Sequence, residues 1–218
     1  MGWFDRLTGR GRAQTSEPPA PVPEIRDIAL FPLHTVLFPG GRQPLKVFEQ
    51  RYLDMVAACM KAGEGFGICL IAAGKEVGEA AVPHPVGTLA EIGDWDMPEL
   101  GILHLTVSGG SRFKILESRT EADGLLRARV EVLAEPAAQA VPEAHQGLVI
   151  LLEQIAADLG PERLPEPHAF DDAAWVGYRL TEVMPVQPLA KQKLLELDDS
   201  LSRLEILHKY LAQKGLVS

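Results

Sequence analysis

Residues 28–63, IALFPLHTVLFPGGRQPLKVFEQRYLDMVAACMKAG, contain two short apolar segments followed by one amphipathic segment. Residues 28–33 have the pattern of a buried strand, and residues 35–41 are a second apolar segment that ends in a turn signal. From residue 48 to residue 62, apolar side chains recur at the period of a helix, and Gly63 follows where a left-handed C-cap belongs. The apolar face of this predicted helix consists of Phe48, Tyr52, Met55, Val56 and Cys59.

More β-structure is predicted between this helix and residue 134. In residues 126–132, Leu, Ala and Val alternate with Arg and Glu, as in a strand with one solvent-exposed face. Residues 96–99 are expected to form the turn of a strand pair, and Gly109-Gly110 is expected to separate two strands. The further strands are expected at residues 65–73, 86–95, 101–108 and 112–117.

Beyond residue 141 the apolar period becomes helical. Asp171 or Asp172 can cap a helix that Pro185 stops, and the pair Asp198-Asp199 precedes the last helix in the same way. The helical segments are expected at residues 148–159, 172–184, 188–197 and 201–211.

The order of these elements predicts an α+β fold, because a β-rich half is followed by a helical half. We expect a tail at residues 1–24, a β-rich part at residues 25–134, a connector with few contacts at residues 135–141 and a helical part at residues 142–218.

The tail, MGWFDRLTGRGRAQTSEPPAPVPE, contains a proline-rich run and carries no net charge. Sequence of this kind suits an extended linker, and we expect a disordered end. Its opening Gly2-Trp3-Phe4 is apolar, which leaves a small docking peptide as the alternative.

The 218 residues carry a formal net charge of −9. Such an acidic body repels a phosphate backbone, so general nucleic-acid binding is disfavoured. The sequence contains no apolar run long enough to span a bilayer and no hydrophobic signal segment, and its two cysteines do not make a disulfide framework. We therefore expect a cytoplasmic protein without a membrane partner.

The templates for catalysis and metal binding do not fit the sequence. The glycine-rich residues 63–67 follow a helix and precede a strand, whereas a phosphate-binding loop needs the opposite order. The six histidines form no paired ligand motif, and Cys59 and Cys69 are interpreted as buried structural thiols. We expect no cofactor and no metal. One hypothesis for Asp94 and Asp96 is that one of them serves an unrecognised hydrolase, and the other is that both lie in a solvated loop.

A basic cluster lies within residues 112–129. We expect its members at the solvent-facing positions of neighbouring strands, and we interpret them as a solvated sheet face rather than an RNA-binding surface. The cluster consists of Arg112, Lys114, Arg119, Arg127 and Arg129.

A series of short motifs runs through most of the chain. They are Pro32-Leu33, Val36-Leu37-Phe38-Pro39-Gly40, Pro44-Leu45, Phe48-Glu49, Arg51-Tyr52, Val86-Gly87-Thr88, Val107-Ser108-Gly109 with Arg112-Phe113, Met184-Pro185, and Lys191-Gln192-Lys193-Leu194-Leu195-Glu196. In this order the motifs resemble the Lon-protease amino-terminal (substrate-binding) domain family, and especially bacterial proteins that consist of that domain alone. The resemblance spans about residues 25–214.

The resemblance implies a PUA-like β pseudo-barrel with one packed helix, followed by a C-terminal helical bundle. It also implies a module that recognises unfolded or degron-bearing polypeptides, acting with a protease or chaperone partner as an adaptor or regulator in protein quality control. The sequence ends at Ser218 without the ATPase and Ser-Lys peptidase regions of Lon proteases, so we expect no enzymatic activity. An RNA-binding PUA-like module is the alternative.

A polypeptide-binding surface needs apolar side chains near loops, because core residues cannot contact a partner. Trp95 and Met97 lie by the expected turn among acidic residues, which would keep an exposed apolar tip soluble. Phe38, just before Pro39-Gly40, is a third candidate. The alternatives are that Trp95 caps the barrel core and that Phe38 is a core residue.

Overall fold

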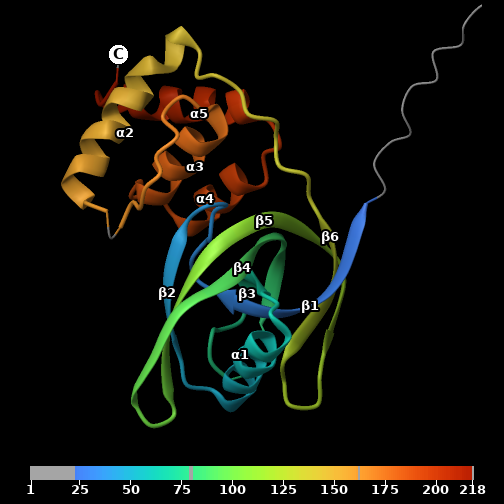
Figure 1. Ribbon diagram of the computed structural model, residues 1–218. Helices are drawn as coiled ribbons and strands as arrows, with labels where there is room; N and C mark the ends of the chain where they lie inside the picture. The colour runs from blue at the N-terminus through green and yellow to red at the C-terminus, as the bar shows by residue number, and fades with distance from the viewer. Residues whose placement is uncertain (1–22, 79–80, 162, 218) are drawn as a thin grey trace, which may run out of the picture.

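The computed structural model describes residues 23–78, 81–161 and 163–217, in which a six-stranded sheet lies below a group of helices (Figure 1). The tail expected at residues 1–24 lies outside the described residues except for Pro23 and Glu24. The strands are β1 (Glu24–Leu33), β2 (Arg42–Val47), β3 (Phe66–Ala73), β4 (Val82–Glu99), β5 (Ile102–Thr120) and β6 (Leu126–Val132). The helices are α1 (Gln50–Ala62), the short 3-10 helix η1 (Glu143–His145), α2 (Gln146–Leu159), α3 (Ala173–Val183), α4 (Pro188–Leu195) and α5 (Ser200–Gln213). The expected α+β class is confirmed.

The sheet closes on itself as a pseudo-barrel. Its strand order is β2-β5-β4-β3-β1-β6, and a further pairing between β5 and β6 completes the ring. Strands β1 and β3 are parallel, and the other pairs are antiparallel. The first half of β5 pairs with β2 and the second half with β6, so β5 connects both ends of the sheet. Strand β2 was not predicted from the sequence.

Helix α1 packs on the barrel, as expected from its apolar period (Figure 1). Tyr52 contacts Phe31 of β1 edge to face, with ring centroids 4.3 Å apart. Gly63 ends the helix with a φ of 68°, a left-handed conformation that glycine adopts without steric cost. Phe48 precedes the helix and is 51% exposed, so its predicted place on the buried face was wrong.

Strand β5 is one continuous element of 19 residues, and the predicted break at Gly109-Gly110 was wrong. The glycine at 109 serves a close approach instead, since a Cβ there would lie 2.1 Å from the carbonyl oxygen of Phe38. The Gly109 carbonyl accepts a hydrogen bond of 2.7 Å from the Gly40 amide. The predicted turn at residues 96–99 was also misplaced: β4 runs to Glu99, and the turn lies at Leu100 and Gly101.

The later helices begin where aspartates were expected to cap them. The Asp172 carboxylate accepts hydrogen bonds from the first amides of α3, including that of Ala174 at 3.2 Å. The Asp199 carboxylate accepts one from the Ser202 amide at the start of α5, at 2.8 Å. Both caps satisfy amides that have no partner within the helix.

Residues 135–141 contact both the barrel and the helices, although we expected a connector with few contacts. The Gln139 carbonyl accepts a hydrogen bond of 2.8 Å from the Ala173 amide. The Glu135 carboxylate contacts Arg112 of β5 at 3.3 Å and accepts a hydrogen bond of 3.0 Å from the Tyr178 hydroxyl of α3. The segment makes these contacts because it passes between two surfaces that carry buried polar groups.

Arg112 is fully buried where β5 meets the helices, so its predicted place on a solvated face was wrong. Its guanidinium donates hydrogen bonds of 3.0 Å to the carbonyl oxygens of Leu195 and Leu197, between α4 and α5. Arg203, also fully buried, stacks 4.2 Å from the ring centroid of Tyr178 and donates to the Leu194 carbonyl at 2.9 Å. Burial raises the pKa of Tyr178 to about 12, so its hydroxyl stays protonated as a donor.

We expect Arg112→Ala to lower the free energy of unfolding by about 3 kcal/mol, since each buried carbonyl left without a donor costs ~1–3 kcal/mol. Lys114→Ala, at an exposed position of the same strand, is the matched control and should leave the urea midpoint unchanged. Equal urea midpoints for wild type and Arg112→Ala would contradict this role for the buried guanidinium.

Candidate functional site

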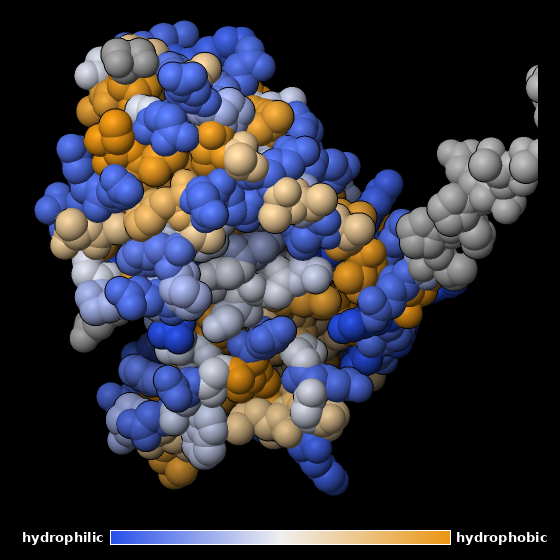
Figure 2. Space-filling model, turned by 45° about the horizontal axis from the view of Figure 1, so that its top comes forward, coloured by the Kyte–Doolittle hydropathy of each residue, from blue (hydrophilic) through white to orange (hydrophobic). Residues whose placement is uncertain are grey.

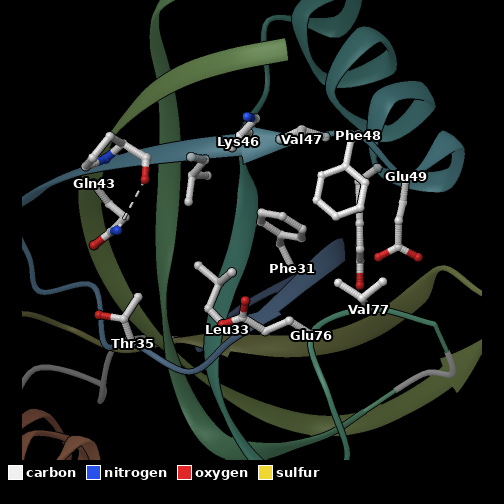
Figure 3. A pocket seen from close by; sticks show the side chains of 13 residues that line it. Phe31, Leu33, Thr35, Gln43, Lys46, Val47, Phe48, Glu49, Glu76 and Val77 are labelled. Carbon is white, nitrogen blue, oxygen red and sulfur yellow. Dashed lines mark hydrogen bonds between the residues drawn. The ribbon is translucent and has the colours of Figure 1, made fainter. Parts of the chain in front are cut away.

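Cavities open on the barrel at both ends of α1. The β2 cavity, of about 350 Å³, lies among β2, the end of β1, the start of α1 and the segment at Glu76-Val77 (Figure 3). The β4 cavity, of about 860 Å³, lies among β1, the end of α1 and β4. Its volume is within the range of known ligand sites.

Apolar side chains make up much of the lining of the β2 cavity. Figure 3 shows Phe31, Phe48 and Val77 converging on it, and Phe31 belongs to the buried core. Its carboxylates already have partners: Glu76 accepts a hydrogen bond from the His34 amide at 2.5 Å, and Glu49 pairs with Arg51 at 3.0 Å. Phe48 and Val77 are the exposed large hydrophobic side chains that line this cavity.

The end of α1 shapes one wall of the β4 cavity. After the left-handed Gly63, the Glu64 amide donates a hydrogen bond of 3.0 Å to the Cys59 carbonyl and the chain turns into β3. Gly65 then passes so close to β4 that a Cβ there would lie 2.2 Å from the Ala90 carbonyl oxygen. Only glycine permits this approach, which brings α1 and β4 to opposite sides of one hollow.

Exposed apolar side chains edge the β4 cavity. Trp95 of β4 lines it and is 55% exposed, so the alternative in which Trp95 caps the barrel core is wrong. Met60 from α1 lines the cavity on another side and is also exposed. Met97 is 42% exposed and lies two residues beyond Trp95 on β4, outside the lining. Met60 was not among the residues predicted from the sequence to bind a polypeptide.

Phe38 lies away from this surface. Its side chain has no exposed area and packs against Tyr178 of α3, with ring centroids 5.9 Å apart. Phe38 is thus a core residue, as the alternative held, and it joins the barrel to the helices. A buried side chain of this kind cannot contact a partner, so its assignment as a binding residue was wrong.

The β4 cavity is acidic. Arg26 is the cation among its lining residues, and it pairs with Glu24 at 2.5 Å. Of the lining carboxylates, Asp27 is held by two arginines, and the hydrogen bond from Arg119 is the largest cause that lowers its pKa. Glu64 and Glu91 form no ion pair with any residue that the structure describes. The cavity therefore offers free negative charge beside apolar surface.

The cavity lacks an activated nucleophile. Cys59 lines it, but burial and the nearby Glu64 raise the pKa of its thiol, which therefore stays protonated at neutral pH. Burial also raises the pKa of Cys69. Among the described residues, no group of three or more His, Cys, Asp and Glu side chains is placed to hold a metal ion. Asp94 and Asp96 are exposed residues of β4.

The basic cluster is smaller in the structure than in the sequence. Arg112 is buried, and Arg119 and Arg127 both pair with Asp27, at 2.7 and 2.9 Å.

Figure 2 shows one face of the molecule, on which hydrophobic patches alternate with hydrophilic groups over both the barrel and the helices. Within the described part of the chain, none of the helices combines the length and apolar character that crossing a bilayer requires.

A family model described as the ATP-dependent protease La (LON) substrate-binding domain matches residues 27–213. The Lon protease of Xanthomonas oryzae pv. oryzae is 29% identical over 193 residues, which cover 85% of this chain and 23% of that protein. Protein cereblon of Gallus gallus is 34% identical over 103 residues, which cover 46% of this chain and 22% of that protein. This chain thus spans about a quarter of the length of the curated relatives that it matches.

Solved structures agree with this match. The crystal structure of a Lon N-terminal domain protein from Xanthomonas campestris superposes with a TM-score of 0.71 at 36% identity, covering 84% of this chain and 96% of that one. The N-terminal domain of Mycobacterium avium complex Lon protease superposes with a TM-score of 0.58 at 18% identity, covering 86% of this chain and 98% of that one. The second likeness shows the fold alone.

The exposures of the two predicted aromatic residues lead to opposite expectations for stability. Trp95→Ala should change the free energy of unfolding by about 0.5 kcal/mol or less, because more than half of the residue is already exposed. Phe38→Ala should cost about 3–5 kcal/mol, the range for a buried aromatic. Urea unfolding gives the free energy of unfolding of both variants. A loss of several kcal/mol in Trp95→Ala would show that Trp95 is a core residue.

Proposed function

Because this chain belongs to the family of Lon protease substrate-binding domains, we propose that it binds unfolded or degron-bearing polypeptide in the β4 cavity. The observation that carries this proposal is an exposed tryptophan at the edge of an open hollow of about 860 Å³. A large rigid aromatic ring supplies contact area at low entropic cost, and such anchors often carry most of the affinity of a small interface.

The remaining lining suits a flexible polypeptide. Met60 has an unbranched side chain that adapts to different apolar partners, and Met97 extends the apolar surface along β4. The end of β4 also carries the exposed carboxylates of Asp94, Asp96 and Glu99, whose charges keep the apolar groups beside them soluble. Weak, adaptable binding is what a module that meets many unfolded sequences needs.

We expect Trp95→Ala to weaken the binding of an unfolded polypeptide by about tenfold or less, which is ~1.4 kcal/mol. The probe is fluorescently labelled, reduced and carboxymethylated α-lactalbumin, and fluorescence anisotropy gives the dissociation constant. Phe48→Ala is the matched control, because it removes an equally exposed aromatic from the β2 cavity. If only Phe48→Ala loses affinity, the polypeptide binds at the β2 cavity instead. Unchanged affinity in Trp95→Ala would exclude Trp95 as an anchor.

The same proposal includes a role without catalysis, in which the chain acts as an adaptor or regulator that brings bound polypeptide to a protease or chaperone partner in the cytoplasm. Its support is a family match confined to the substrate-binding domain, together with two free cysteines, which fit a reducing compartment. An RNA-binding role has less support, because Arg112 is buried and Arg119 and Arg127 pair with Asp27. Of the basic cluster, only Lys114 and Arg129 are exposed without an ion pair to a described residue.

The purified chain should hydrolyse neither ATP nor peptides, because nothing at the β4 cavity activates a nucleophile. Phosphate release and cleavage of labelled casein measure the two activities. Reproducible turnover by pure protein would overturn the proposal that the chain only binds.

A further inference from the structure

The β4 cavity leaves two kinds of group free for a ligand. Trp95 and Met60 are exposed apolar side chains at its edge, and Glu64 and Glu91 are carboxylates without an ion-pair partner among residues 23–78, 81–161 and 163–217. A ligand that satisfies both kinds carries a large apolar side chain close to positive charges, since both apolar burial and charge complementarity then favour binding.

The chain itself contains such a sequence. Residues 2–12, GWFDRLTGRGR, combine the adjacent aromatic residues Trp3 and Phe4 with the three arginines of the tail, and Asp5 is the one acid among them. This segment lies outside the described residues, and the proposed function makes no use of it. Its composition complements that of the cavity in both apolar character and charge.

The described chain begins close to the cavity. Residues 13–22 join it to Pro23, and Arg26, three residues further along, already lines the cavity. Ten extended residues span up to ~33 Å, which is ample for a site that begins beside β1. A segment held by a short tether has an effective concentration on the order of 1 mM at a neighbouring site.

We propose that residues 2–12 occupy the β4 cavity of their own chain, with Trp3-Phe4 against Trp95 and Met60 and the arginines near Glu64 and Glu91. This inference rests on the proposed function, because it assigns a second, internal ligand to the same cavity. The segment competes with polypeptide substrates. At an effective concentration of ~1 mM, a segment with an intrinsic dissociation constant of ~0.1 mM lowers the apparent affinity for a substrate about tenfold.

The test compares full-length variants in the same anisotropy assay with carboxymethylated α-lactalbumin. The double variant Trp3→Ser/Phe4→Ser should bind this probe about five to ten times more tightly than wild type. Thr8→Ala/Gln14→Ala alters two tail positions outside the proposed contacts and should bind as wild type does. A labelled peptide of residues 2–12 should bind the Trp3→Ser/Phe4→Ser variant, lose affinity when Trp95→Ala is added, and bind more weakly as salt screens the charges.

The outcomes separate this inference from the proposed function. Equal affinity of wild type and Trp3→Ser/Phe4→Ser for the probe overturns internal occupancy and leaves polypeptide binding intact. If neither protein binds the probe, the proposed function fails, and binding of the labelled peptide at Trp95 then decides the inference alone. A third outcome is that the wild-type protein binds the probe more weakly at higher protein concentration and forms dimers in analytical ultracentrifugation. This outcome would place the segment in the cavity of a second copy and overturn occupancy within one chain.

Discussion

The guanidinium of Arg112 lies where the barrel meets the helices, and its hydrogen bonds go to the carbonyl oxygens of Leu195 and Leu197. A charge removed from water must be paired and hydrogen-bonded, so this side chain permits few arrangements of the two parts. Arg179 of α3 acts in the same way from the helical side, donating 2.6 Å to the Pro39 carbonyl. These contacts hold the middle of β5 against the helices. The first part of β5 pairs with the last part of β4, where Trp95 lies opposite Leu105.

Features set by local sequence could be predicted. The period of α1, its C-cap at Gly63 and the aspartate caps of α3 and α5 depend on residues within a few positions of one another. Contacts between segments distant in the sequence could not be predicted. The alternation of polar and apolar residues placed Arg112 on a wet face, and only the helices that cover β5 from 83 positions away bury it. Likewise, the strand break predicted at Gly109 is a close approach to Phe38.

The candidate site could be predicted in part. A tryptophan among acidic residues near a turn indicated an exposed apolar group, and Trp95 is exposed although the turn lies further along the chain. Met60, Glu64 and Glu91 were missed, because α1, β1 and β4 meet at this cavity only in the folded chain. The one signal in the sequence was Met60 itself, an apolar residue in the last turn of α1 outside the predicted apolar face.

Nuclear magnetic resonance of methyl-labelled methionines tests binding in the β4 cavity most directly. Met60 and Met97 are exposed at or beside this cavity, whereas Met55 and Met184 are buried in the barrel and the helical core and serve as internal controls. On titration with unlabelled carboxymethylated α-lactalbumin, the methyl signals of Met60 and Met97 should shift or broaden, and those of Met55 and Met184 should stay in place. Unchanged Met60 and Met97 signals at concentrations where the anisotropy assay shows binding would place the polypeptide elsewhere on the molecule.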